Sequence, residues 1–206
     1  VSALIHAATM VAAGVYLIAR TFPLFTPQSL QVVLCVGLAT HLFAGTVALT
    51  MTDIKGVLAY STISQLGLMV TAMGLGAMPM AIFHLITHAF FKALMFLGVG
   101  SVIHATHEQD LSRLGGLFRV MPWTAATFLA GALAMSGLPP LSGFWSKDAI
   151  LLEAQRGHGW VLALLTLGSL MTAAYAFRLY LLCFHGPSMA VPGHARHASG
   201  GESPWI

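Results

Sequence analysis

Apolar residues fill long stretches of this chain, and most polar residues gather in the short segments between them. The pattern predicts helices over residues 1–20, 26–51, 53–76, 79–104, 121–150 and 160–184. Each stretch is long enough to cross a bilayer, because about 20 apolar residues span its hydrocarbon core. The sequence therefore predicts an all-α integral membrane protein with about six transmembrane helices.

The stretch 121–150 contains an interruption near its middle. The segment Gly-Leu-Pro-Pro-Leu-Ser-Gly occupies residues 137–143, and consecutive prolines remove backbone donors and end an α-helix. A broken helix persists inside a membrane only where protein surrounds it or where it lines a cavity. Such breaks are typical of ion paths in transporters. Lys147 and Asp148 follow the break directly.

Several local features predict how the helices begin and pack. Thr26 and Asp53 are expected to cap the helices that follow them, since their side-chain oxygens accept from free backbone N–H groups. A small-residue pattern at Gly67, Gly74 and Gly76 is expected to let another helix approach closely. Arg178 is expected to pair with a carboxylate on Glu153 or Asp148, or to face lipid head groups.

Composition agrees with a membrane protein and excludes other classes. Hydrophobic residues make up 57% of the chain and charged residues 7%, whereas soluble domains hold about 25% charged residues. The basic residues are scattered without a basic-aromatic patch, so nucleic acid is not an expected partner and the lipid bilayer is. No nucleotide loop, haem attachment motif or iron–sulfur cysteine set is present. We therefore expect no cofactor in this chain.

The most informative polar residues are His84, His88 and Lys92. Their i, i+4, i+8 spacing puts them on one face of a helix, each about 6 Å above the last. A lysine near the middle of a span costs about 3 kcal/mol on insertion scales. Burial destabilises its charged form, so it can load and release a proton, and histidine titrates near physiological pH. This face is therefore a candidate proton relay.

Other interpretations of these residues stay open. Lys92 could pair with a carboxylate on another helix or extend its amine to the interface. His84 and His88 could be hydrogen-bonded at a polar helix interface. Their spacing also suits zinc, although no third ligand is evident, and no metal site is expected.

Three further residues are candidates at the ends of this path. Lys147 could be a second proton site at an exit, with Asp148 modulating it; the alternative is an interfacial charged pair, which stabilises little. His6 could link this unit to whatever precedes it, or could be a hydrogen-bonded histidine between helices. His41 is expected to be a hydrogen-bonded histidine between helices and not a proton site.

Lysines and arginines in the connections indicate the orientation. Arg20 and Arg156 fall on one side of the membrane. Lys55, Arg113 and Arg119 fall on the other, together with Arg196. Because cytoplasmic loops carry the excess of basic residues, the second side is expected to be cytoplasmic or its organelle equivalent.

Four long strings carry a resemblance to a known family. They are VSALIHAATMVAAGVYLIART, DIKGVLAYSTISQLGLM, IFHLITHAFFKALMFLGVGSVIHATHEQDLSRLGGL and LPPLSGFWSKDAIL. With these strings the chain resembles, over nearly its whole length, the antiporter-like membrane subunits of NADH-quinone oxidoreductase, respiratory complex I.

The resemblance implies roles for the candidate residues. Lys92, in HAFFKAL, corresponds to the central-axis lysine of the second half-channel, and His84 and His88 match its neighbouring histidines. Lys147, in FWSKDAIL, corresponds to the terminal lysine on the broken helix, with Asp148 beside it.

The resemblance also implies a domain organisation. The family fold has two inverted five-helix repeats. Residues 1–22 would be the last helix of the first repeat, in which His6 matches the histidine that bridges the halves. Residues 23–186 would form the second, proton-channel repeat, and 187–206 a loop leading to a further helix. The chain is thus expected to be an internal piece of a longer protein.

The implied function is proton translocation driven by electron transfer in other subunits. NADH, FMN, iron–sulfur clusters and quinone would belong to those subunits, and the partners would be other subunits of the complex I membrane arm. The expected location is the bacterial inner membrane. Alternatives are a large subunit of a sodium/proton antiporter, a related hydrogenase or inorganic-carbon-uptake subunit, and a structural anchor.

Overall fold

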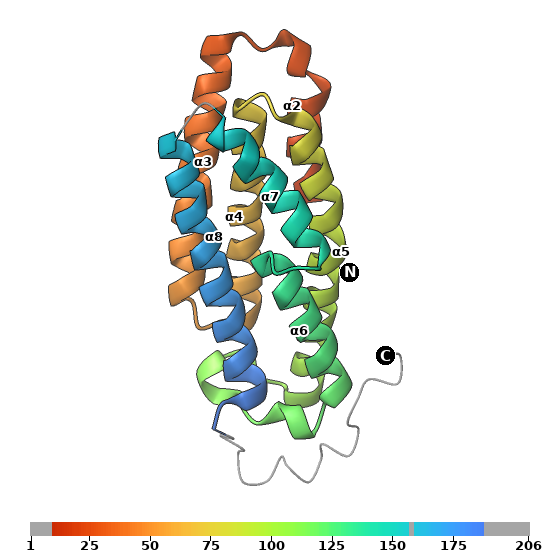
Figure 1. Cartoon of the computed structure of the whole chain (residues 1–206). Helices are drawn as coiled ribbons and strands as arrows, with labels where there is room; N and C mark the ends of the chain where they lie inside the picture. Colours follow the sequence, from red (N-terminus) through yellow and green to blue (C-terminus); the bar gives the residue numbers. More distant parts are fainter. Residues whose placement is uncertain (1–9, 157–158, 188–206) are drawn as a thin grey trace.

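The computed structural model describes residues 10–156 and 159–187, which form an elongated bundle of roughly aligned helices (Figure 1). Its long helices are α2 (Met10–Arg20), α3 (Pro27–Thr50), α4 (Ile54–Gly74), α5 (Met78–Thr106), α6 (Pro122–Ser136), α7 (Ser142–Gln155) and α8 (Gly159–Tyr180). Single turns are η2 (Phe22–Leu24), η3 (Leu111–Arg113) and η4 (Leu117–Arg119), and α8 continues as a π-helical turn, η5 (Leu181–His185).

The fold-class prediction is confirmed: this is an all-α integral membrane protein. Among the described residues, four helices are long and apolar enough to cross a membrane, namely α3, α4, α5 and α8 with its π-helical turn. Large apolar side chains face outward, as Phe43 (71% exposed) and Phe90 (76% exposed) show. The N-terminal helix expected over residues 1–20 lies partly outside the described residues, so the number of crossings stays a prediction.

The predicted helix break is confirmed. Helices α6 and α7 lie end to end, with the break near mid-height of the bundle (Figure 1). Gly137 ends α6 in the left-handed conformation at φ 81°, and its N–H bonds the Ala134 carbonyl at 3.1 Å. A Cβ on Gly143 would lie 1.8 Å from that same carbonyl oxygen. The first turn of α7 therefore rests directly on the last turn of α6.

Helices α3 and α4 pack with their backbones close together. A Cβ on Gly67 would lie 2.4 Å from the His41 backbone nitrogen, and one on Gly74 would lie 2.4 Å from that of Leu34. These two glycines thus act as predicted, because small residues allow backbones to approach. Gly76 does not: it has φ 81° and nothing within 4 Å of an added Cβ, since it lies in the turn after α4.

Helices α3 and α4 begin with side-chain caps. Thr26 accepts from the Ser29 N–H at 3.3 Å, and Asp53 accepts from the Gly56 N–H at 2.8 Å. Both predicted N-caps are therefore confirmed, and each satisfies a backbone donor that a helix start leaves free.

Arg178 has a different partner from the one expected. Its Nη1 donates to the Met51 carbonyl at 2.9 Å, while Glu153 pairs with Arg156 at 3.0 Å. Met51 is the C-cap of α3, where free carbonyls and the helix dipole favour a cation. Arg178 thus joins the end of α3 to α8 instead of pairing with a carboxylate.

The charged connection after α5 is fixed to the start of α4. The Ile54 N–H donates to the Gln109 carbonyl at 2.9 Å. Hydrogen bonds from backbone N–H groups lower the pKa of the Glu108 carboxyl, and the backbone and hydroxyl of Ser112 lower the pKa of the Asp110 carboxyl. Both carboxylates are therefore stabilised in their ionised forms at this membrane face.

The glycine contact between α3 and α4 gives a prediction about stability. Gly67→Ala should destabilise the full-length protein by about 1–3 kcal/mol, because the new methyl group meets backbone that cannot move aside. Thermal unfolding in mild detergent measures the effect. The control is Gly100→Ala, where a Cβ meets nothing within 4 Å. Equal stability of the two variants would show that the close approach is not required.

Candidate functional site

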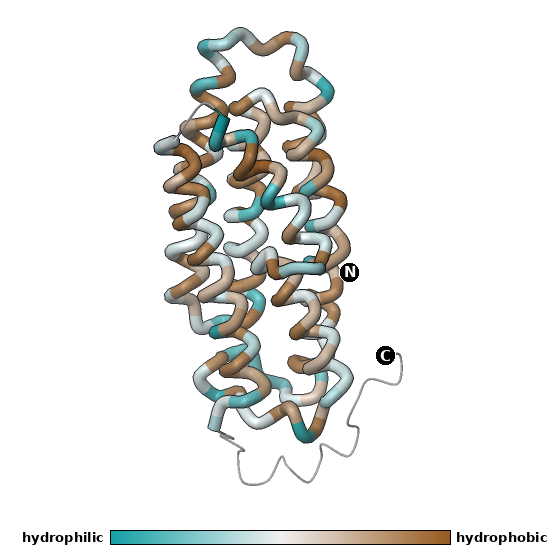
Figure 2. Tube along the Cα trace, in the orientation of Figure 1, coloured by the Kyte–Doolittle hydropathy of each residue, from teal (hydrophilic) through white to brown (hydrophobic). Residues whose placement is uncertain are grey.

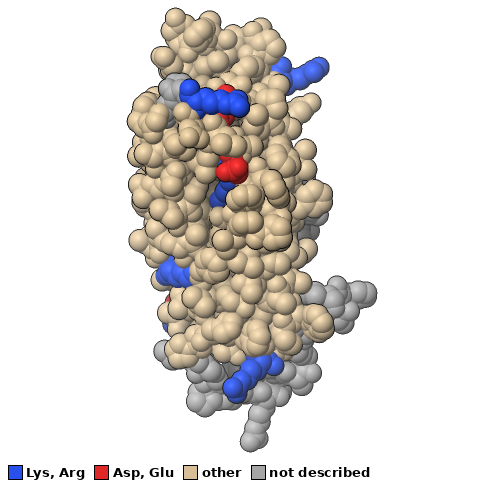
Figure 3. Space-filling model, viewed as in Figure 1, with Lys and Arg blue, Asp and Glu red and all other residues tan. Residues whose placement is uncertain are grey.

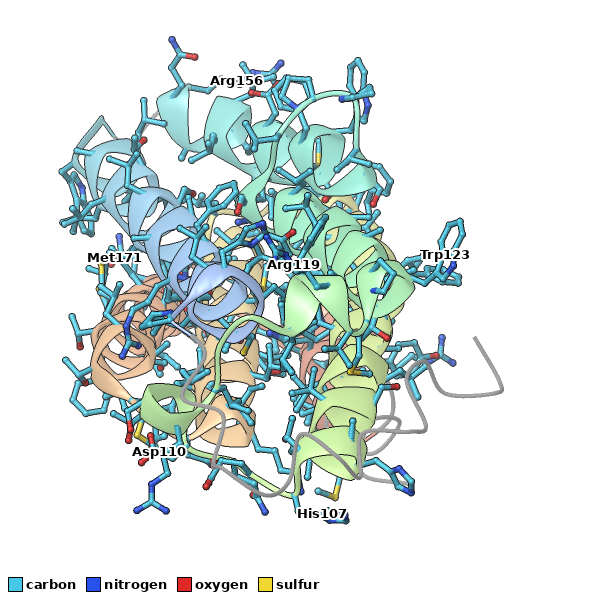
Figure 4. The ribbon with its side chains drawn as sticks, turned by 90° about the horizontal axis from the view of Figure 1, so that it is seen from below. His107, Asp110, Arg119, Trp123, Arg156 and Met171 are labelled. Carbon is cyan, nitrogen blue, oxygen red and sulfur yellow. The ribbon has the colours of Figure 1, made fainter. Side chains whose placement is uncertain are left out.

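Polar side chains fill the interior of the bundle instead of its surface. Among the described residues, the buried polar and charged ones are His41, Ser61, Thr62, Ser64, Gln65, Thr71, His84, Thr87, His88, Lys92, Thr124, Ser146, Lys147 and Thr172. Hydrophilic positions within α7 lie well inside the height of the bundle (Figure 2), and the view along the axis shows side chains filling the space between helices (Figure 4). Buried polar groups at this density need a reason beyond packing.

The α5 residues singled out by their spacing do share one buried face. His84 and Lys92 are 0% exposed and His88 is 1% exposed. The ring centroids of the two histidines are 6.3 Å apart, close to the spacing that one helical turn predicts. The face is buried because α5 packs against α4, α6 and α7.

Lys92 has polar partners but no acidic one in the part of the chain that the structure describes. Its Nζ donates to the Ser61 hydroxyl and lies 3.4 Å from the Met135 sulfur. The ion pairs found there are Arg113 with Glu108 and Arg156 with Glu153. Among the described residues, Lys92 therefore does not pair with a carboxylate on another helix, which was one of the alternatives from the sequence.

Lys147 lies at the break of the long helix. The residue is 4% exposed, and its amine donates to the Met135 carbonyl at 2.6 Å. Met135 stands in the last turn of α6, where carbonyls lack helical partners and the dipole is negative. The break of the helix thus creates a site that stabilises a cation in the protein interior.

The two lysine amines meet on one residue. Lys92 contacts the sulfur of Met135, and Lys147 contacts its carbonyl oxygen. Two unit charges about 10 Å apart repel by roughly 1.7 kcal/mol at an effective dielectric of 20. A proton on one amine therefore changes the free energy of placing a proton on the other.

Asp148 stands at the wall of a cavity next to Lys147. The cavity has a volume of about 160 Å³. Its lining residues are Ser136, Gly137, Phe144, Lys147, Asp148, Leu151 and Ser169. Asp148 is half-buried, and it forms no ion pair with Lys147 within the described ranges. Figure 3 shows an acidic group directly beside a basic one in the upper half of this face, apart from the charged groups that lie nearer its two ends and at its left edge.

His84 is held by residues from two other helices. Its Nδ1 lies 2.8 Å from the Ser146 hydroxyl of α7, and its Nε2 lies 3.1 Å from Oε1 of Gln65 on α4. The Gln65 amide nitrogen continues to the Thr172 hydroxyl of α8 at 3.2 Å. A polar chain therefore crosses the bundle from α8 to the broken helix through His84.

His88 lies between His84 and Lys92. Its ring meets Phe91 edge to face at 5.3 Å between centroids. Its Nε2 is buried and makes no hydrogen bond to the described residues. Buried ring nitrogens normally have a hydrogen-bond partner in protein or ordered water. Among His84, His88 and Lys92, His88 is therefore the residue at which hydrogen bonds between described protein groups are interrupted.

His41 stands on α3, outside the α5 row. The Nδ1 of His41 is 2.8 Å from the Ser64 carbonyl, as expected for a histidine that joins two helices. His6 lies outside the described residues, so its proposed link to the preceding repeat stays a prediction. In the described part of the chain, no group of three His, Cys, Asp or Glu side chains could hold a metal ion.

Sequence reasoning missed the residues that connect the candidates. Met135 joins the two lysines, while Ser146 and Thr172 belong to the polar chain through His84. The signal that the sequence does carry is the group of polar residues inside an apolar span at Ser61, Thr62, Ser64 and Gln65, and this group does not identify its partners on other helices.

Comparison with known proteins gives consistent relatives. Subunit L of the NADH-quinone oxidoreductase of Pseudomonas aeruginosa is 52% identical and covers 100% of this chain and 34% of its own length. Chain 5 of the NAD(P)H-quinone oxidoreductase of Picosynechococcus sp. is 52% identical, over 90% of this chain and 30% of its own. The F(420)H(2) dehydrogenase subunit L of Methanosarcina mazei is 51% identical, over 94% of this chain and 32% of its own length. The chain spans about a third of each relative.

A solved structure and a family model agree with these relatives. A structure of the Mrp complex from a Dietzia species matches with a TM-score of 0.81 and 39% identity, covering 86% of this chain and 21% of that one. The family model described as NADH:quinone oxidoreductase/Mrp antiporter, TM, matches residues 1–172. The chain therefore belongs to the NADH:quinone oxidoreductase/Mrp antiporter family of transmembrane proteins.

Proposed function

We propose that this chain forms a proton path in the antiporter-like membrane subunit of a complex I type NADH:quinone oxidoreductase. The observation that carries the proposal is the pair of buried lysines, Lys92 and Lys147, that reach the same residue, Met135. Neither has an acidic partner among the described residues. A chain that only held other subunits together would gain nothing from two buried lysines, since placing each of them inside a membrane costs free energy.

The path runs along the buried face of α5 and ends at the broken helix. A proton moves along His84 and His88 to Lys92, and from there to Lys147. Gaps of about 6 Å need one or two bridging waters, since one hydrogen bond covers about 2.8 Å. Asp148, beside the cavity next to Lys147, would favour a proton leaving there, and His6 would connect the path to the first repeat.

Charge repulsion couples the steps of this path. A proton on Lys92 raises the free energy of the charged form of Lys147, and the reverse holds. Each amine nevertheless has groups that accept its hydrogen bonds when it is charged: a hydroxyl for Lys92 and a helix carbonyl for Lys147. Loading one site therefore favours unloading the other.

The energy source would lie in other subunits. By similarity to subunit L of the NADH-quinone oxidoreductases, the partners would be further membrane-arm subunits, and electron transfer would use cofactors that those subunits hold. The bacterial inner membrane is the proposed location, with the connections that carry Lys55 and Arg113 on the cytoplasmic side.

Sodium/proton exchange is the second candidate function. It is favoured by the likeness to a structure of an Mrp complex at 39% identity. The same buried lysines would then serve exchange, and no redox subunit would be needed.

Purification of the full-length protein in mild detergent, with mass spectrometry of its partners, separates these functions. We expect flavin and iron–sulfur subunits to accompany it. If only small membrane subunits without redox centres appear, the protein is an antiporter subunit, and transport should then depend on the external cation.

Replacing Lys92 tests the centre of the path. Lys92→Ala in the assembled complex should slow proton transfer along the path about 10²-fold or more, the contribution to the rate that is typical of a positioned proton-transfer group, and should thereby lower the yield of pumped protons per electron. Proton uptake by vesicles, measured together with NADH oxidation, gives the yield. Lys55→Ala, at an exposed lysine on α4, is the control. An unchanged yield for Lys92→Ala in an intact complex would refute the role.

Replacing Lys147 tests the exit. Lys147→Ala should slow proton release and lower turnover, and Lys147→Gln should do the same although it keeps a donor for the Met135 carbonyl. If turnover and pumping fall in the alanine variant alone, Lys147 serves to cap α6 and not to carry a proton. Normal pumping in both variants would remove Lys147 from the path.

A further inference from the structure

The hydrogen bonds around His84 determine which of its ring nitrogens carries a proton. The starting point is Thr172, whose hydroxyl donates to the Gly168 carbonyl of its own helix at 2.9 Å. A hydroxyl has one proton to donate, so the Thr172 oxygen can only accept from its other neighbours. Tyr175 already donates to it at 3.4 Å.

This acceptor fixes the orientation of Gln65. The atom of the Gln65 amide that faces Thr172 has to be the NH₂ group, which donates across 3.2 Å. The amide oxygen then faces Nε2 of His84 at 3.1 Å. Because that oxygen only accepts, Nε2 of neutral His84 has to carry the proton.

The lone pair of His84 therefore lies on Nδ1, which faces Ser146 at 2.8 Å. The Ser146 hydroxyl donates to it while His84 is neutral. The same hydroxyl has other acceptors: the Thr87 hydroxyl oxygen lies at 2.9 Å, and the carbonyls of Ser142 and Gly143 lie at 3.2 Å and 3.4 Å. Both carbonyls belong to the first turn of α7, at the helix break.

We propose that Gln65 and Ser146 are positioning residues for His84. Gln65 holds the ring with its proton on Nε2, so that protons enter and leave at Nδ1 alone. When His84 gains a proton, its new Nδ1–H donates to the Ser146 oxygen, and the Ser146 hydroxyl proton turns to another acceptor, the Thr87 oxygen or a carbonyl of α7. The protonation state of His84 is thereby transmitted to the broken helix, one residue before Lys147.

The inference rests on the proposed proton path, in which His84 is a relay group, but its first test does not depend on pumping. NMR of the histidine ring nitrogens in the full-length protein, with His84 assigned by its loss in His84→Gln, reports which nitrogen is protonated. We expect a single species with the proton on Nε2. A proton on Nδ1 in the unaltered protein would overturn the proposal.

Removing the amide should release this constraint. In Gln65→Met the fraction of the other tautomer should rise about fivefold, the effect of losing one hydrogen bond. Thr71→Val is the matched control, because Thr71 is buried on the same helix and, among the described residues, its hydroxyl bonds its own helix alone, at the Gly67 carbonyl. An unchanged tautomer in Gln65→Met would also overturn the proposal.

The hydroxyl of Ser146 is tested by its loss and its restoration. Ser146→Ala should slow proton transfer through His84 about fivefold, the effect of losing one hydrogen bond, and so lower the proton yield per electron. Ser146→Thr, which restores a hydroxyl, should recover it. If Ser146→Ala pumps normally while Lys92→Ala does not, the proton path stands and this inference fails. If Lys92→Ala also pumps normally, the proton path fails, and the NMR result still decides the tautomer of His84.

Discussion

The solvation of two lysine amines by protein groups is the constraint on which the rest of the structure depends. An ammonium group in an apolar slab needs acceptors, and within the described residues no carboxylate supplies them. The break between α6 and α7 provides a free helix carbonyl for Lys147, and α4 provides a hydroxyl for Lys92. The broken helix is thus a means of solvating charge where water is scarce.

Close packing of α3 on α4 follows from the same need. Helix α4 turns its polar residues inward, and this places the Gln65 amide beside His84. The backbone of α3 then approaches α4 at Gly67, and the ring of His41 lies against α8 at Gly168, where a Cβ would be 2.1 Å from its Nε2. The orientation that turns the polar side of each helix toward the interior of the bundle also turns its apolar side toward the lipid.

The sequence predicted what depends on neighbouring residues in the chain. Span lengths, the caps at Thr26 and Asp53, the break at 137–143 and the shared face of the α5 residues all follow from local pattern. Contacts between helices did not follow, because helices that are apolar almost all round do not indicate how each is rotated about its axis. The partners of Arg178 and Lys92 depend on that rotation, so they required the structure.

The position of the helix break has a consequence for the membrane potential. Lys92 and Lys147 contact the same residue where α6 ends, near mid-height of the bundle (Figure 1). A full crossing changes the energy of one elementary charge by about 2.3 kcal/mol per 100 mV. Even over about 10 Å, a charge that moves between these amines would cross only about a third of a hydrocarbon core about 30 Å thick. The voltage would therefore act mainly on the steps that join the lysines to the two aqueous sides, while the transfer between them takes the smaller share.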